Sequence, residues 1–142
     1  MDERIAVEPR DRGTPVPAED AHRVGILRRT AAARLRHAGL GELIDSVGLV
    51  VSEMVTNALR HSGTCEIRLV LDVQDGFLTV VVIDGMPGKA TPITPAAVTS
   101  ESGRGLLIVQ SVAEDHGGTW GVSESGAQTW CQLAVPIQQA AQ

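Results

Sequence analysis

TCEIRLVLDVQDGFLTVVVID, residues 64–84, has the pattern of two β-strands joined by a tight turn. Apolar and polar residues alternate in the first half, as they do in a strand with one buried face. Asp75-Gly76 is a turn signal, and the run from Phe77 onward is almost continuously apolar. Strands joined by so short a turn pair as an antiparallel hairpin, because a parallel pair needs a long crossover. The expected buried face of the first strand is formed by Cys65, Ile67, Leu69, Leu71 and Val73.

Two helices are expected before this hairpin. Residues 18–38 carry an apolar stripe at helical spacing, and residues 43–61 form a second helix that ends at Ser62-Gly63. The first helix has no acidic residue between positions 21 and 41 and carries Arg23, Arg28, Arg29, Arg34 and Arg36. We favour a solvated face whose long side chains cover the edge of the core. The alternative is a contact surface for an acidic partner protein.

The segment after the hairpin, residues 85–105, contains several glycines and prolines and little regular patterning. A loop of that length inside a compact domain is usually either functional or a sign that an element has been wrongly assigned. A short apolar helix follows from Leu106, and two last strands, at 119–125 and 127–136, pair across Gly126.

The order of these elements predicts an α+β fold, a two-layer α/β sandwich with the helices packed on one face of a mixed, mostly antiparallel sheet. It lacks the strand–helix alternation of a doubly wound nucleotide fold, and no GxxxxGK[ST] phosphate loop occurs in the sequence. A length of 142 residues fits one domain. We expect that domain at residues 18–136, between a flexible N-terminal tail at 1–17 and a C-terminal tail at 137–142.

Composition argues against several classes of function. The net charge is −5 and the aromatic residues are only Phe77, Trp120 and Trp130, which disfavours binding of nucleic acid through phosphates or base stacking. No apolar run is long enough to span a membrane, and the first twenty residues lack the apolar core of a signal peptide, so we expect a cytoplasmic protein. Cys65 and Cys131 lie in expected strands and are interpreted as buried free thiols.

The second helix carries polar residues beside its buried face. Glu53, Asn57 and His61 recur every four residues, so they lie along one side of the helix, next to Met54 and Ala58. A half-buried carboxylate and amide cost free energy unless they find partners. Either they form a hydrogen-bonded pair or a solvated edge, or they form a site in which the amide oxygen binds Mg²⁺ and the carboxylate orients a nucleophile. Spacing alone leaves both explanations open.

Two further candidate segments lie downstream. Asp84 ends the second strand of the hairpin, where its carboxylate either accepts a hydrogen bond from an exocyclic amine or caps the turn. Gly103-Arg104-Gly105-Leu106 opens the third helix, where glycines let backbone N–H groups approach a phosphate at the positive end of the helix dipole. Glycine-rich turns are also common where no ligand binds.

In their order along the chain, these segments resemble the histidine-kinase-like ATPases, which share the Bergerat nucleotide-binding fold. Within that superfamily, LVVSEMVTNALRHSG (49–63), VVVIDGMPGKATP (80–92) and ESGRGLLIVQSVAEDHGGTWGV (101–122) are similar to the bacterial anti-sigma-factor serine/threonine kinases. The resemblance covers residues 18–136. One departure is Met86, which stands where the family's first glycine box, DxGxG, often has its middle glycine, and which would narrow the conformations open to the backbone beside the base.

The resemblance implies a role for each matching residue. Glu53 would be the general base that acts on the attacking hydroxyl, and Asn57 would be the protein ligand of Mg²⁺. Asp84 would bind the adenine amine, Gly88 would leave room beside the base, and Thr129 would reach the adenine through its hydroxyl or a water. The remaining matches, which would lie around the phosphates of ATP, are His61, Gly103, Arg104, Gly105 and Leu106.

The implied function is that of an ATP-dependent protein serine/threonine kinase that phosphorylates an anti-sigma-factor antagonist. Sequestration of a sigma factor and pairing into a homodimer are further properties that the resemblance suggests. The alternative is a non-catalytic module that binds partner proteins and uses nucleotide as a structural ligand. The catalytic half of a sensor histidine kinase is disfavoured, because His22 and His37 lie on a helix that the domain needs for its own core.

Overall fold

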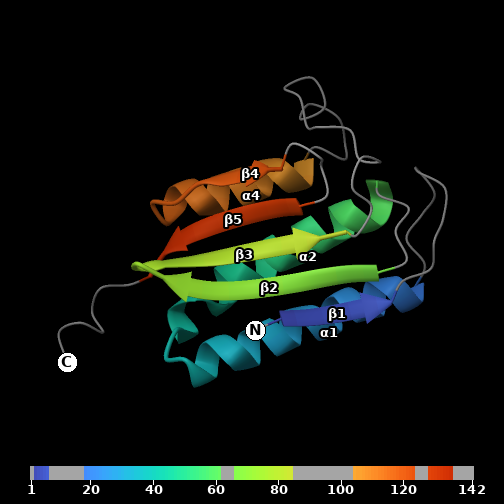
Figure 1. Ribbon diagram of the computed structural model, residues 1–142, viewed down its shortest axis with the longest axis horizontal. Coiled ribbons are helices and arrows are strands. Elements are labelled where there is room, and N and C mark those ends of the chain that lie inside the picture. Colours follow the sequence, from blue (N-terminus) through green and yellow to red (C-terminus); the bar gives the residue numbers. More distant parts are fainter. Residues whose placement is uncertain (1, 7–17, 62–65, 85–103, 124–127, 136–142) are drawn as a thin grey trace.

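The computed structural model describes residues 2–6, 18–61, 66–84, 104–123 and 128–135 (Figure 1). The chain begins with strand β1 (Asp2–Ala6), helix α1 (Ala18–His37), the short 3₁₀ helix η1 (Gly41–Leu43) and helix α2 (Ile44–His61). The strands β2 (Glu66–Gln74) and β3 (Phe77–Ile83) follow, and then α4 (Arg104–Asp115), β4 (Trp120–Val122) and β5 (Gln128–Ala134). The helices and strands predicted from the sequence are thus confirmed, and β1 is added to them.

The strands form one five-stranded sheet in the order β1-β2-β3-β5-β4. Every neighbouring pair is antiparallel, so the described strands contain none of the parallel pairs that a mixed sheet would have. β3 lies at the centre, paired with β2 on one side and with β5 on the other. Because both pairings are antiparallel, the end of β3 lies beside the starts of β2 and β5.

The turn between β2 and β3 has the geometry that its sequence predicts. Gln74 lies opposite Phe77, which leaves Asp75 and Gly76 as a two-residue loop. Their φ angles are 55° and 82°. Positive φ at both positions is the requirement of a type I′ turn, for which Asp-Gly is a preferred pair. The hairpin register is therefore fixed by local chemistry.

β1 differs from the expectation of a flexible tail at residues 1–17. Its residues pair with β2, from Asp2 opposite Val70 to Ala6 opposite Glu66. Asp2 also forms a two-pronged ion pair with the guanidinium of Arg68 on β2. This contact lowers the pKa of Asp2, because its carboxylate accepts hydrogen bonds from Arg68 and lies close to that positive charge. The first strand therefore belongs to the sheet, while residues 7–17 lie outside the described part of the chain.

The core lies between the sheet and the helices, which cover one face of it (Figure 1). Along β3 the buried residues are Leu78, Val80 and Val82, and residues of β2 and β5 alternate in the same way. Among the described residues, the fully buried set contains no aromatic side chain. Each buried Val or Leu contributes about 1.5–3 kcal/mol relative to an exposed one.

α2 is the central helix and packs against α1, α4 and β3 (Figure 1). On the side of α1, Arg28 donates a hydrogen bond to the hydroxyl of Ser52 at 3.3 Å, and its aliphatic stem passes over Gly48. On the side of α4, the Oγ atom of Ser46 lies 2.8 Å from Nε2 of His116. None of the described helices is both long enough and apolar enough to cross a membrane.

Candidate functional site

The second half of α2 carries two polar side chains at the edge of the core. Glu53 and Asn57 are both partly buried, and Val50 and Met54 beside them are fully buried. A carboxylate and an amide in such a position have lost part of their hydration, which favours partners that can replace it. The pair is therefore placed to interact with a ligand or with a neighbouring element.

The Ser46–His116 contact identifies the neighbouring element. Ser46 lies in the first turn of α2, and His116 follows the last residue of α4. Glu53 comes seven residues after Ser46, almost two full helical turns, so both side chains leave the helix in nearly the same direction. Asn57 lies one turn further along. Glu53 and Asn57 therefore lie on the side of α2 that faces α4.

α2 and α4 pack against each other and run in opposite directions (Figure 1). The end of α4 lies beside the start of α2, so the start of α4 lies beside the second half of α2. The first N–H groups of any α-helix lack intrahelical partners and carry partial positive charge. In α4 these groups belong to the segment that begins at Arg104 and Gly105. The side chain of Leu106 is fully buried in the core, so only its backbone is available to a ligand.

Asp84 directly follows β3 and is 5% exposed, which makes it the one charged residue that is buried within the described part of the chain. It continues the alternation of Val80 and Val82, so its side chain lies on the helix-covered face of the sheet. Burial of a carboxylate is costly unless polar groups compensate for it. Asp84 therefore places a carboxylate that needs polar partners at this end of the central strand.

Thr129 lies on the neighbouring strand at the same end of the sheet. It pairs with Val82 of β3, and Cys131 and Leu133, which follow at alternate positions of β5, are fully buried. Thr129 thus shares the helix-covered face with Asp84, which is only two residues beyond Val82. In an antiparallel pair, residues in such diagonal positions lie about 7–8 Å apart. One planar ring of a ligand could therefore contact both side chains.

The described parts of the expected site thus lie at one end of the molecule. The second half of α2, the end of β3, the start of β5 and the start of α4 all lie at the same end of the molecule, on the right in Figure 1. Gly88 and Gly103, together with Met86 and Cys65, lie outside the described residues, and the side chains of His61 and Arg104 do as well. Their expected roles stay predictions.

Two supporting contacts were not anticipated from the sequence. The Ser46–His116 hydrogen bond joins residues 70 positions apart, and Arg28–Ser52 joins residues 24 positions apart. The one local signal was the spacing of Ser46 and Glu53, which places both on one helix side. No group of three or more His, Cys, Asp or Glu residues suited to hold a metal ion occurs in the described ranges.

Comparison with known proteins identifies the family. A search of curated proteins finds no similar sequence. A family model for the histidine kinase-like ATPase domain matches residues 3–133, which is nearly the whole chain and includes β1. The match agrees with the helix-covered antiparallel sheet and with the resemblance of the sequence segments. The chain therefore belongs to the histidine kinase-like ATPase domain family.

Proposed function

We propose that this protein is an ATP-binding regulatory protein serine/threonine kinase. Membership of a family of ATPase domains supports ATP as the ligand. The finer assignment rests on one observation: Glu53 and Asn57 lie one turn apart on the side of α2 that faces α4, at the end of the sheet where Asp84 is buried. This arrangement offers a polar group to each part of a nucleotide.

The residues present suit ATP with Mg²⁺. The buried carboxylate of Asp84 is a hydrogen-bond acceptor for the exocyclic amine of adenine, and the hydroxyl of Thr129 lies on the same face of the sheet. The amide oxygen of Asn57 is a hard ligand of the kind that Mg²⁺ prefers. When bound, the ion would neutralise phosphate charge, and a single protein ligand makes its binding depend on the nucleotide.

The phosphate end is assigned to the start of α4. The backbone N–H groups at Gly105 and Leu106 belong to the first turn of this helix, which favours anions. Arg104 opens that turn and Gly103 precedes it, His61 ends α2, and Gly88 follows Asp84 along the chain. We assign these residues to the surroundings of the phosphates and of the base.

Glu53 is assigned as the general base. It is separated from Asn57 by one helical turn, so it lies beside the position proposed for the ion. There its carboxylate orients the hydroxyl of the protein substrate and accepts its proton. Phosphoryl transfer depends chiefly on positioning and charge neutralisation, and a base adds about 10²–10⁴-fold.

The substrate that we propose is an anti-sigma-factor antagonist, in the cytoplasm, with a sigma factor as a second partner and a homodimer as the assembly. This follows from the similarity of the segments at 49–63, 80–92 and 101–122 to the bacterial anti-sigma-factor kinases. A non-catalytic module that binds its partner only in the nucleotide-bound state is the second candidate. The retention of Glu53 beside Asn57 favours the kinase.

The decisive experiment measures transfer of the γ-phosphate from labelled ATP to candidate antagonist proteins. We expect label on a serine or threonine of the antagonist. Glu53→Gln should lower the rate by about 10²–10⁴-fold and leave ATP affinity within about twofold, because it keeps the shape of the side chain and removes the base. Glu114→Gln makes the same change at an exposed position of α4 and should alter neither quantity.

The outcomes separate the two candidates. If the wild-type protein binds ATP and its partner without transferring phosphate, it is the non-catalytic module. If Glu53→Gln abolishes ATP binding as well as transfer, the assignment of Glu53 as the base is wrong.

A further inference from the structure

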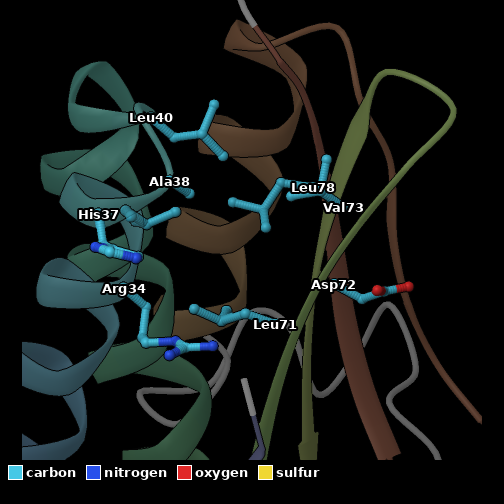
Figure 2. A pocket seen from close by; sticks show the side chains of 9 residues that line it. Arg34, His37, Ala38, Leu40, Leu71, Asp72, Val73 and Leu78 are labelled. Carbon is cyan, nitrogen blue, oxygen red and sulfur yellow. The ribbon is translucent and has the colours of Figure 1, made fainter.

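A pocket lies at the opposite end of the sheet from the candidate nucleotide site. Figure 2 shows a pocket between the last turn of α1 and the β2–β3 hairpin, with a volume of about 240 Å³. Leu71 and Leu78 line it from the sheet, and Leu40 lines it from the segment after α1. These residues lie next to the turn at Asp75-Gly76, whereas Asp84 lies at the other end of β3.

The floor of the pocket is apolar and part of it faces solvent. Leu40, Leu71 and Leu78 are buried members of the core, and their side chains converge in Figure 2. Val73 continues the row of Leu69 and Leu71 on the same face of β2, but it is 51% exposed. An exposed valine beside a leucine-lined hollow is apolar surface that an incoming group can cover.

The rim of the pocket is basic. Arg34 and His37 lie along the α1 side in Figure 2, and both are exposed. Within the described residues, neither side chain forms an ion pair or hydrogen bond with another residue. Asp72 also borders the pocket, but its carboxylate points away from it in Figure 2. The permanent charge directed at an occupant is therefore the positive charge of Arg34, and His37 adds an imidazole beside it.

The size of the pocket indicates what it can hold. Sites for drug-sized ligands measure about 300–1,000 Å³, whereas a cavity of about 150 Å³ suffices for a benzene ring. A volume of about 240 Å³ lies between the two and fits one large aliphatic or aromatic side chain. Protein partners commonly bind through such a single anchor in a pocket, with charged groups at the rim.

We propose that this pocket docks an acidic segment of a partner protein through one large apolar side chain. The anchor contacts Leu71, Leu78 and Val73, and carboxylates that flank it in the partner sequence pair with the guanidinium of Arg34 and accept a hydrogen bond from an N–H group of His37. The charge of the rim argues for an acidic segment, and the volume argues for a single anchor. The site shares no described residue with the candidate nucleotide site, so it stands independently of the proposed kinase activity.

The test uses the full-length ¹⁵N-labelled protein and three capped pentapeptides. The first is Glu-Glu-Phe-Glu-Glu, the second has Ala in place of Phe, and the third is Lys-Lys-Phe-Lys-Lys. We expect the first peptide to shift the amide signals of Arg34, Leu40 and Val73 in a saturable manner, with the other two peptides binding at least about tenfold more weakly.

Charge reversal supplies matched variants. Arg34→Glu should weaken the first peptide about tenfold, since it replaces an attraction by a repulsion at the rim. Arg36→Glu makes the same change in the same helical turn but outside the pocket, and should change the affinity less than about twofold. Val73→Glu places a carboxylate on the apolar edge and should weaken the peptide without touching α1.

Four results of the peptide titrations would overturn the proposal, and so would one result without peptide. They are equal binding of the alanine peptide, equal loss in the Arg34→Glu and Arg36→Glu variants, full affinity in Val73→Glu, and shifts confined to other parts of the protein. If the same amides move when the protein alone is diluted, the occupant is a second copy of the chain and the acidic-partner proposal is wrong. Thermal melts of the variants separate a lost contact from a lost fold.

Discussion

At the scale of single residues, location distinguishes Asn57 from another side-chain amide of the same protein. Asn57 is partly buried on the side of α2 that faces α4, whereas Gln110 on α4 donates a hydrogen bond to Glu114 at an exposed position. The two side chains offer the same chemical group. Only Asn57 is one turn from a partly buried carboxylate and at the end of the sheet that holds Asp84.

Asn57→Ala should remove the Mg²⁺-dependent part of ATP affinity, because the proposed protein ligand of the ion is lost. In the wild-type protein, chelation of Mg²⁺ with EDTA should weaken ATP binding by at least about tenfold in a calorimetric titration. In Asn57→Ala the affinity should already be low and should respond little to EDTA. Gln110→Ala serves as the control and should behave as wild type. Normal Mg²⁺-dependent affinity in Asn57→Ala would exclude this metal site.

Cys131 provides a pH-dependent test of the core. Burial raises the pKa of its thiol from an ordinary value of 9.0 to about 12. The folded state therefore holds the proton more tightly than the unfolded state. The stabilisation is complete below about pH 9 and is lost as the pH rises toward 12. The free energy of unfolding should fall in this window by up to about 1.4 kcal/mol per pH unit.

This slope is measurable because the sequence has no tyrosine and Lys89 is its single lysine, so few other groups titrate there. Urea unfolding at pH 8, 9 and 10 should show the decline in the wild type. In Cys131→Ala the slope should be smaller, whatever stability the truncation itself costs. Identical slopes in the two proteins would mean that the buried thiol does not control alkaline stability.

At the scale of elements, the sequence predicts those features that depend on residues close together in the chain. The β2–β3 hairpin follows from alternation and Asp75-Gly76, and the polar side of α2 follows from the four-residue spacing of Glu53 and Asn57. β1 was missed because Asp2–Ala6 is short and polar, and its ion pair with Arg68 joins residues 66 positions apart. The basic pocket was missed for the same reason, since α1 and the hairpin form it together.

The exit of α4 gives a prediction at this scale. Gly118 donates its N–H to the carbonyl of Ala113 at 2.8 Å, which closes the helix, and a Cβ atom added there would lie 1.6 Å from the carbonyl oxygen of Gln132. Gly118→Ala must therefore separate α4 from β5. We expect a loss of about 3 kcal/mol in the free energy of unfolding, measured by urea denaturation.

Gly39→Ala is the comparison for that variant. Gly39 lies in the corresponding turn at the end of α1, where it matches Gly117 rather than Gly118; its φ angle is 79°, and nothing lies within 4 Å of the position of an added Cβ atom. Gly39→Ala therefore costs only the strain of the left-handed backbone, about 1–2 kcal/mol, with no steric overlap. A loss in Gly118→Ala no larger than the loss in Gly39→Ala would contradict the close contact between α4 and β5.

At the scale of the whole molecule, the two candidate sites lie at opposite ends of one core. The sheet runs without interruption from the turn at Asp75-Gly76 to Asp84, and the buried side chains of β3 connect the two ends. A ligand that binds the folded state stabilises all of it against global unfolding, by about 2.7 kcal/mol at a concentration one hundred times its Kd. The free energy of local opening rises only in those segments that the ligand contacts.

Amide hydrogen exchange with and without Mg²⁺–ATP should separate these effects. Amides that exchange only by global unfolding, expected at Val80 and Val82 on the central strand, should slow in proportion to the added stability. Amides that exchange by local opening should slow in the second half of α2 and at the start of α4. Amides near Arg34 and Val73 that exchange by local opening should keep their rates, because the candidate nucleotide site lies at the other end of the sheet. Asn57→Ala should remove the local protection; equal local protection at both ends would contradict the separation of the sites.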